Sequence, residues 1–138
     1  MRYMSKEILA DQLAFIKEQA EFIQDTTSEI TGVNDFLSSQ SGMVLYNSTC
    51  MCLQTIGETV KKIDESTKGN FFSTYYPEIP WKSVIGLRNV ISHEYQDTDH
   101  GEIFNIIKLD IPKLTLVVGT IINDVTSGRY DDFLNKKE

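Results

Sequence analysis

Apolar residues recur at helical spacing along most of this chain, and this periodicity is what most restricts the fold it can adopt. The first segment, from about Ser5 to Gln24, is predicted to be a helix with Ser5 as its N-cap. Its apolar residues follow at intervals of four, three, four and three positions: Leu9, Leu13, Ile16, Ala20 and Ile23. No convincing strand alternation or internal repeat is present. We therefore predict an all-α fold, an antiparallel bundle of four main helices plus a short helix.

A second helical region is predicted from about residue 35 to residue 66, and residues near 38–42 allow a break in it. Its later part places five apolar residues on one face: Leu45, Cys52, Ile56, Val60 and Ile63. Gly57 lies inside this region, although glycine costs a helix about 1 kcal/mol relative to alanine. A close crossing by another helix is the structural reason we expect for this glycine.

Three more helices are predicted, over about residues 80–95, 100–108 and 110–127. Asp99 and Asp110 are expected to cap the second and the third of them. Gly128 should end the last helix, and the tail from residue 131 to 138 is expected to be loose. His100 is expected to be an exposed surface residue.

An aromatic run precedes the helix at residue 80: Phe71, Phe72, Tyr75 and Tyr76. Such rings next to a nucleic-acid site could stack on bases. The interpretation that we favour is that they attach the irregular segment to the bundle. Trp81 is expected to anchor the following helix in the core.

The composition is typical of a soluble globular protein, with 41% hydrophobic and 24% charged residues among 138. One domain over residues 1–138 is expected. No apolar run approaches about 20 residues, and the first residues lack the hydrophobic part of a signal peptide, so we expect a cytoplasmic protein. Cys50 and Cys52 point about 200° apart on a helix, so we expect unpaired, buried cysteines rather than a disulfide or a zinc site.

Five polar residues close together in one predicted helix carry most of the chemistry: Arg88, Asn89, Ser92, His93 and Tyr95. Arginine is a permanent cation, and histidine titrates near neutral pH. Together they suit metal-free chemistry on a phosphodiester, in which one group moves protons and another stabilises charge on phosphate oxygens. Taken alone, a polar stripe of this kind is more often a solvated helix face.

The helical period predicts how these residues are directed. At about 100° per residue, Val84 and Leu87 face a core, while Arg88 and His93 lie about 140° apart on the polar side. The two cannot touch directly, but both could border one groove. Two copies of the helix across a twofold axis would bring two arginines and two histidines together. We therefore predict a homodimer with these helices near the axis.

Three patches of the sequence together resemble the HepT-like proteins, a branch of the HEPN superfamily. They are Ile56-Gly57-Glu58, the run from Pro77 to Tyr95 with its Pro-Trp, Leu-Arg-Asn and His-x-Tyr elements, and the run from Leu109 to Leu114. The patches occur in the order found in the family, and the resemblance covers nearly the whole chain. It implies a small all-helical dimer that acts as the toxin of a toxin–antitoxin pair and cleaves RNA without a metal.

The resemblance also assigns roles to individual residues. It implies that Arg88 and His93 occupy the catalytic positions. It implies that Tyr95 is the tyrosine that the partner, a nucleotidyltransferase antitoxin, adenylylates. Asn89 and Ser92 are expected to support the site, and Glu58 either orients a basic group there or is a solvated helix residue. RNA is the expected substrate, and no metal or other cofactor is expected.

The net charge of −7 is the main objection to a nuclease, because nucleic-acid binding usually leaves a basic footprint. A small local patch would answer it, formed by Lys61, Lys62, Lys68, Lys82 and Arg88. A nuclease acting on a short exposed RNA needs few phosphate contacts. The alternative function is a non-catalytic helical binding module that pairs with a nucleotidyltransferase.

Overall fold

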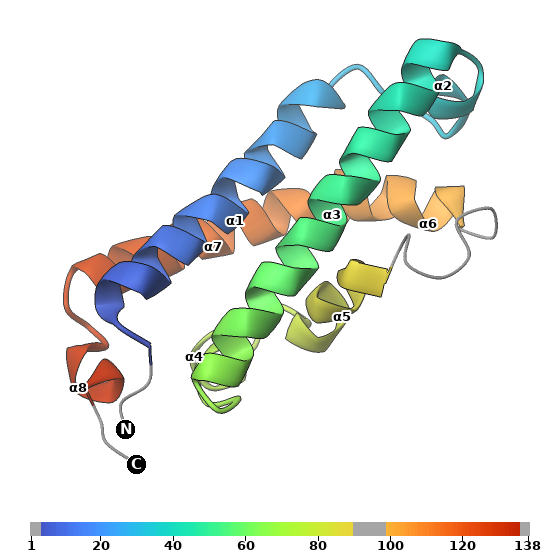
Figure 1. Ribbon diagram of the computed structural model, residues 1–138. Coiled ribbons are helices and arrows are strands. Elements are labelled where there is room, and N and C mark those ends of the chain that lie inside the picture. Colours follow the sequence, from blue (N-terminus) through green and yellow to red (C-terminus); the bar gives the residue numbers. More distant parts are fainter. Residues whose placement is uncertain (1–3, 90–98, 136–138) are drawn as a thin grey trace.

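The computed structural model describes residues 4–89 and 99–135, and every regular element in these ranges is helical. The body of the bundle is formed by α1 (Lys6–Thr26), α3 (Gln40–Ser66) and α7 (Ile111–Thr126). In Figure 1, α1 runs antiparallel to α3 and to α7, and it packs against both. The shorter α5 (Trp81–Gly86) packs against the opposite side of α3. The predicted all-α antiparallel bundle is confirmed.

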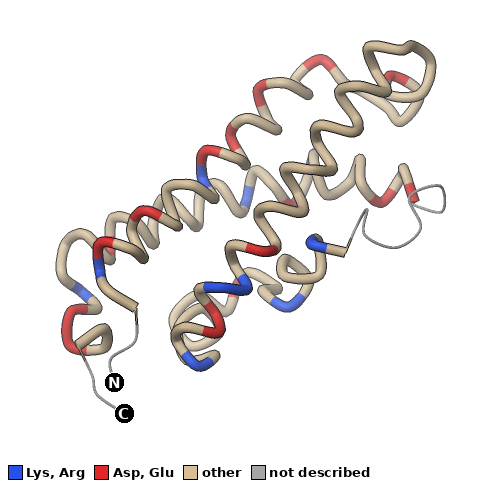
Figure 2. The backbone as a smooth tube through the Cα atoms, viewed as in Figure 1, with Lys and Arg blue, Asp and Glu red and all other residues tan. Residues whose placement is uncertain are grey.

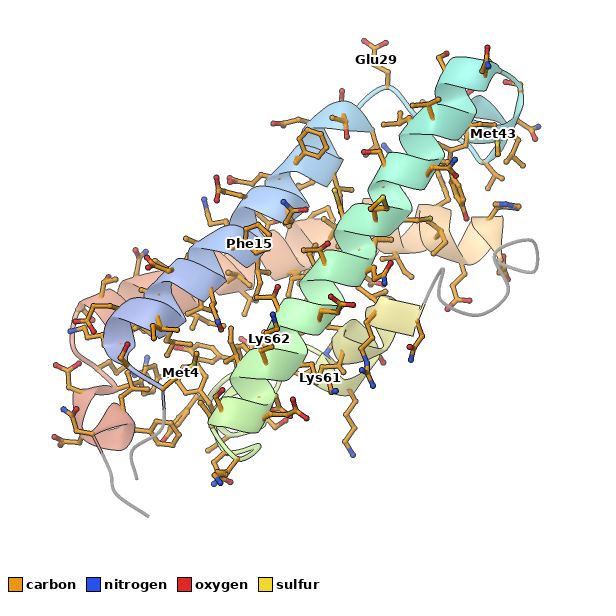
Figure 3. The ribbon with its side chains drawn as sticks, viewed as in Figure 1. Met4, Phe15, Glu29, Met43, Lys61 and Lys62 are labelled. Carbon is orange, nitrogen blue, oxygen red and sulfur yellow. The ribbon has the colours of Figure 1, made fainter. Side chains whose placement is uncertain are left out.

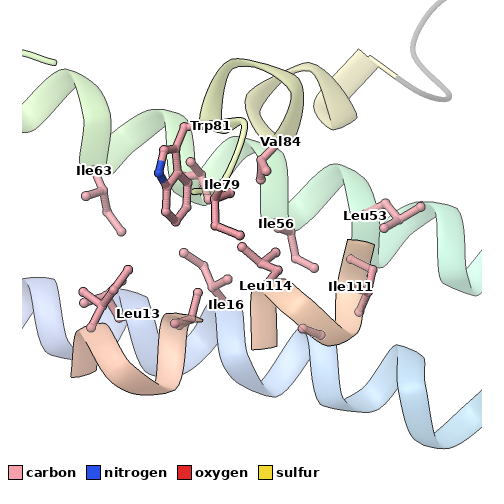
Figure 4. Packing of buried hydrophobic residues seen from close by; sticks show 14 of the residues in the cluster. Leu13, Ile16, Leu53, Ile56, Ile63, Ile79, Trp81, Val84, Ile111 and Leu114 are labelled. Atoms are coloured by element: carbon pink, nitrogen blue, oxygen red, sulfur yellow. The ribbon is translucent and has the colours of Figure 1, made fainter. Parts of the chain in front are cut away.

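The core lies between these helices and contains the apolar seam predicted for α1. Figure 4 shows how α1, α3, α7 and the segment around α5 each contribute to it. The side chains that meet there include Leu13, Ile16, Leu53, Ile56, Ile63, Ile79, Trp81, Val84, Ile111 and Leu114. Ser5 caps α1 as predicted, because its hydroxyl accepts a hydrogen bond from the backbone N–H of Ile8 at 3.2 Å. None of the described helices is both long and apolar enough to span a membrane.

The second helical region is interrupted, as the sequence allowed. The short helix α2 (Asn34–Leu37) ends before Ser39, whose side chain then caps α3 by accepting from the backbone N–H of Gly42 at 3.0 Å. The buried face of α3 is wider than predicted, because α1 packs on one side of it and α5 on the other. Tyr46 and Leu53 are fully buried, whereas the predicted core residue Leu45 is only half-buried.

The two cysteines are unpaired, as expected. Cys50 is fully buried, and this burial raises the pKa of its thiol to about 11. Cys52 is half-buried, and burial raises its pKa as well. A thiol with a raised pKa carries little thiolate at neutral pH, so both side chains behave as small apolar groups.

The aromatic run attaches the segment around α4 (Phe72–Tyr75) to the bundle, which confirms the favoured interpretation. The ring of Phe72 stacks on Trp81 with centroids 4.0 Å apart. The hydroxyl of Tyr130 donates to Tyr76 at 2.8 Å, and that of Tyr76 donates to the carboxylate of Asp124 at 2.6 Å. Burial, followed by these two hydrogen bonds, raises the pKa of Tyr76.

The same aromatic contacts order the start of the C-terminal tail. The chain turns at Gly128, whose φ of 95° favours glycine, and then forms α8 (Asp131–Leu134). Tyr130 and Leu134 are buried. The prediction that the tail is loose from residue 131 is therefore wrong for α8. The reason is a contact with residues far earlier in the chain, such as that of Tyr130 with Phe71 at a centroid distance of 5.0 Å.

Residues 100–126 form one continuous helical stretch, although the sequence predicted a break before Asp110. Asp99 caps α6 (His100–Asn105), accepting from the backbone N–H of Glu102 at 3.1 Å. A π-helix, η3 (Ile106–Asp110), then leads directly into α7. Asp110 has helical dihedrals and makes no capping hydrogen bond, so its predicted role as an N-cap is wrong. Pro112 lacks the N–H that an α-helix needs there, and a wider turn accommodates that loss.

Candidate active site around Arg88 and Asn89

The crossing of α5 over α3 is centred on Gly57. A Cβ atom at Gly57 would lie 2.6 Å from the backbone nitrogen of Arg88 and 2.9 Å from the carbonyl oxygen of Val84. Backbone atoms cannot swing aside as the end of a side chain can, so only glycine allows this approach. The close crossing predicted for Gly57 is confirmed, and it holds the backbone of Arg88 directly against α3.

The helix that carries Arg88 changes its geometry at this crossing. The single α-helix predicted over residues 80–95 ends at Gly86, and η1 (Leu87–Asn89) is a 3₁₀-helix. A 3₁₀-helix has about 3.0 residues per turn instead of about 3.6. The directions projected for Arg88 and Asn89 at about 100° per residue therefore do not apply, whereas the projected angle of about 140° between Arg88 and His93 stays a prediction because His93 lies outside the described residues.

Arg88 is half-buried, whereas the helical projection placed it on the solvated side. Its Nε atom is inaccessible to solvent. Asn89, the next residue, is exposed. A guanidinium whose inner part is fixed by packing loses less conformational entropy when its outer nitrogens bind an anion. The inner part of the Arg88 side chain is therefore packed into the surface of the bundle.

The other predicted site residues fall into two groups. Glu58 follows the crossing glycine on α3 and is exposed, and the described part of the structure gives it no hydrogen bond or ion pair. Its role in orienting a basic group stays a prediction. Ser92, His93 and Tyr95 lie outside the described residues, so their positions relative to Arg88 are also predictions.

The basic residues expected to form a local patch occur at one end of the bundle. Figure 2 shows Lys and Arg positions concentrated in the C-terminal part of α3 and in α5 and η1. In Figure 3, Lys61 and Lys62 lie on the C-terminal part of α3. Lys61 also approaches Glu65 at 3.8 Å, which neutralises part of its charge. The positive charge is therefore local and interspersed with carboxylates.

A cleft of about 840 Å³ lies between two walls: α5 and η1 form one of them, and the stretch from α6 to α7 forms the other. Apolar side chains line much of its surface: Ile79, Val84, Leu87, Ile103, Ile106 and Leu114. Asn89 and Ser83 contribute polar atoms from the α5 side, and Asp99, Glu102 and Asp110 contribute carboxylates from the opposite side. Lys113 also lines the cleft, so its charged lining consists of three carboxylates and one ammonium group, a balance that does not favour an anion there.

Sequence reasoning missed the contribution of the stretch from α6 to α7 to this cleft. The residues involved were assigned to two separate helices, but η3 joins them into one wall of the cleft. His100, predicted to be exposed, is half-buried and contacts the ring of Tyr46 edge-on at a centroid distance of 5.0 Å. Among the described residues, no cluster of three His, Cys, Asp or Glu side chains could hold a metal ion.

Comparison with known proteins connects these observations to one family. The family model described as ribonuclease HepT-like matches residues 16–121. This range includes both sides of the crossing at Gly57, the motif from Arg88 to Tyr95 and the run from Leu109 to Leu114.

Individual relatives agree with the family match. The protein named putative RNase MJ1380 of Methanocaldococcus jannaschii is 32% identical over 111 residues, which cover 80% of this chain and 94% of that protein. The probable ribonuclease HepT of Thermococcus cleftensis is 33% identical over 104 residues, 75% of this chain and 86% of that protein. No solved structure was found to match the chain.

Proposed function

This chain belongs to the HepT-like ribonuclease family, and on that premise we propose that it is a metal-independent RNA endonuclease, the toxin of a type II toxin–antitoxin pair. The observation that carries the proposal is the position of Arg88. Its backbone is held on Gly57, the inner part of its guanidinium is buried, and it begins the motif that ends at Tyr95. The family membership and the names of the relatives support RNA as the substrate.

The proposed chemistry uses the ribose 2′-hydroxyl as the nucleophile, which explains how a site without a metal can cleave RNA. His93 removes the proton of the 2′-hydroxyl while its oxygen attacks phosphorus. The bond to the 5′-oxygen breaks, and that oxygen takes a proton from an imidazolium, either the same His93 or its copy in a dimer. Arg88 stabilises the negative charge that develops on the phosphate oxygens. Asn89 and Ser92 help to orient the phosphate or His93.

We further propose that the active form is a homodimer with the motif segments near the twofold axis. The helical projection that first suggested a dimer depends on His93, which lies outside the described residues, so that projection stays a prediction. What supports the dimer is the resemblance stated for the sequence, together with the prevalence of twofold symmetry among oligomers. In this arrangement each catalytic pair of Arg88 and His93 would have its copy close by.

The acidic balance favours a second candidate, a non-catalytic module that binds a nucleotidyltransferase. The net charge is −7, and carboxylates are interspersed with the basic positions near Arg88. Such a module would keep Arg88 for contact with a nucleotide or a protein. The two candidates differ in one result, because only the first cleaves RNA.

The proposed function is tested by incubating the purified chain with labelled single-stranded RNA in EDTA. We expect cleavage to continue, with a 2′,3′-cyclic phosphate or a 3′-phosphate on the upstream product, because the 2′-oxygen attacks phosphorus. The matched control is the same oligonucleotide made of DNA, which lacks that nucleophile and should stay intact. Loss of cleavage in EDTA would contradict the metal-free mechanism. An absence of cleavage under all conditions would favour the binding module.

Tyr95 is the proposed regulatory residue. Adenylylation there would add bulk and negative charge next to the site that RNA phosphate must enter. Incubation with the nucleotidyltransferase partner and ATP should add AMP to the peptide that contains Tyr95 and reduce cleavage. Tyr95→Phe should cleave RNA but escape the modification, because it keeps the ring and lacks the hydroxyl that accepts AMP. If mass spectrometry finds AMP transferred equally well to this variant, Tyr95 is not the regulated residue.

A further inference from the structure

The outer side of α1 carries a row of large apolar residues that the core does not use. Ile8, Phe15 and Phe22 follow one another at intervals of seven residues, and their side chains are 51%, 41% and 49% exposed. The buried seam of α1 is complete without them. Figure 3 places Phe15 on the exposed surface where α1 runs beside α3. Spacing of seven aligns side chains along one line of a helix, as in the seam of a coiled coil.

A second row, of carboxylates, runs beside the apolar one. Asp11, Glu18 and Asp25 each follow an apolar residue of the first row by three positions, and all three are exposed. Residues three positions apart are neighbours on a helix surface. Figure 2 shows the repeated acidic positions along α1. The outer side of α1 is therefore amphipathic in a particular way, with an apolar row flanked by an acidic row of the same length.

The lysines of α1 do not neutralise this acidic row. Lys6 pairs with Asp131 at 3.1 Å, and Lys17 pairs with Glu21 at 3.1 Å. Within the described part of the chain, Asp11, Glu18 and Asp25 have no ion pair. A partner that supplied cations at the same spacing would meet carboxylates that are still available.

We propose that this face of α1 binds a basic amphipathic helix of another protein. Charge decides between the candidate occupants. An RNA backbone would place phosphates against the carboxylate row, and a second copy of this chain would present the same acidic row and no basic row to match it. A helix with an apolar row and a neighbouring row of Lys or Arg matches both features at once. In Figure 1, α3 lies between α1 and η1, so this face is distinct from the site at Arg88, and the inference does not depend on the proposed catalysis.

Two synthetic peptides of the same 21-residue length as α1 serve as the probe. Both carry leucine at the heptad positions a and d, and they differ only in having arginine or glutamate at e and g. Fluorescence anisotropy with the full-length chain should show binding of the arginine peptide and no binding of the glutamate peptide. Phe15→Ala alone, and Asp11→Asn combined with Glu18→Gln, should each weaken binding by about tenfold or more. Leu109→Ala is the matched control and should have no effect, because Leu109 is 69% exposed on η3 and does not line the groove that contains Glu18.

Binding that is lost with the carboxylate substitutions but unchanged in Phe15→Ala would overturn the proposal, since the contact would then be non-specific charge attraction. Binding unchanged in both variants would also overturn it. Circular dichroism of each variant confirms that the helical content is kept.

A photo-crosslinking amino acid in place of Phe15 identifies the natural occupant in cells. We expect a cross-link to another protein, at a peptide that carries Lys or Arg at helical spacing beside apolar residues. Cross-links to copies of this chain, to RNA or to no partner would overturn the proposal. Sedimentation of the variant with the photo-crosslinking amino acid at position 15 tests whether this face of α1 forms the proposed dimer. Loss of the dimer in this variant would assign the face to a second copy of the chain.

Discussion

Replacing His93 with alanine is expected to reduce RNA cleavage by about 10²–10⁴-fold, the usual effect of losing a group that transfers a proton in the transition state. Arg88→Ala should reduce it by about 10²–10³-fold, because the charge on the phosphate oxygens would lose a fixed donor. Both effects should appear in single-turnover rates at saturating RNA. The same variants should relieve inhibition of growth when the chain is expressed without its antitoxin.

The structure sets the controls for this pair. Arg88 is half-buried with its Nε inaccessible, so Arg88→Ala can also lower the stability of the fold. Arg88→Lys keeps the charge and the aliphatic stem but removes the planar fork, and it should still be strongly impaired. Lys82→Ala removes an exposed cation of α5, so it should raise the KM mainly at low salt and make the KM less dependent on salt. If His93→Ala cleaves RNA as fast as the unmodified chain, the catalytic assignment is wrong.

Gly57→Ala is expected to destabilise the fold and to impair cleavage together. The added Cβ would lie 2.6 Å from the backbone nitrogen of Arg88, a distance that real Cβ contacts do not show. The crossing must therefore widen, at a cost of about 1–3 kcal/mol, partly offset by about 1 kcal/mol from the better helix propensity of alanine. Moving α5 and η1 away from α3 also moves Arg88, and a displacement of about 1 Å can reduce a rate by about 10²-fold.

Gly119→Ala on α7 is the matched control for this substitution. It makes the same chemical change inside a helix, but its Cβ would lie 3.6 Å from the end of the Lys17 side chain, an ordinary contact. Denaturant unfolding should therefore show Gly119→Ala to be neutral or slightly stabilising, with cleavage unchanged. A Gly57→Ala variant with unaltered stability and unaltered cleavage would show that the crossing does not position Arg88.

The residues near Arg88 show what local sequence patterns can predict and what they cannot. The unusual glycine inside a helical pattern predicted a close crossing, because glycine has little other reason to remain there, and the structure has that crossing at Gly57. The pattern did not show that the crossing partner is the backbone of Arg88 itself. Nor did it show that the helix tightens into η1 at this point, because the α-helical and 3₁₀ forms of a three-residue segment differ little in local preference.

The other corrections have a similar cause. Asp110 and Pro112 resemble a helix start in the sequence, yet the chain passes through them as one helix with a π-turn, and α1 packs against both η3 and α7. The tail after Gly128 is short and polar enough to be expected loose. Its order comes from Tyr130 and Leu134, which are buried against aromatic residues far away in the sequence.

The sequence by itself determined the helical class, the buried seam of α1, the caps at Ser5 and Asp99, and the family. Each of these features depends either on residues that are near one another in the chain or on a motif as a whole. Only the tertiary structure decided which helix faces α3 at Gly57, how deeply Arg88 is buried, and that α6 and α7 form one wall of a cleft. These features depend on contacts between distant segments, whose distances no local periodicity specifies. The amphipathic outer row of α1 required both, since its spacing is in the sequence and its exposure is in the fold.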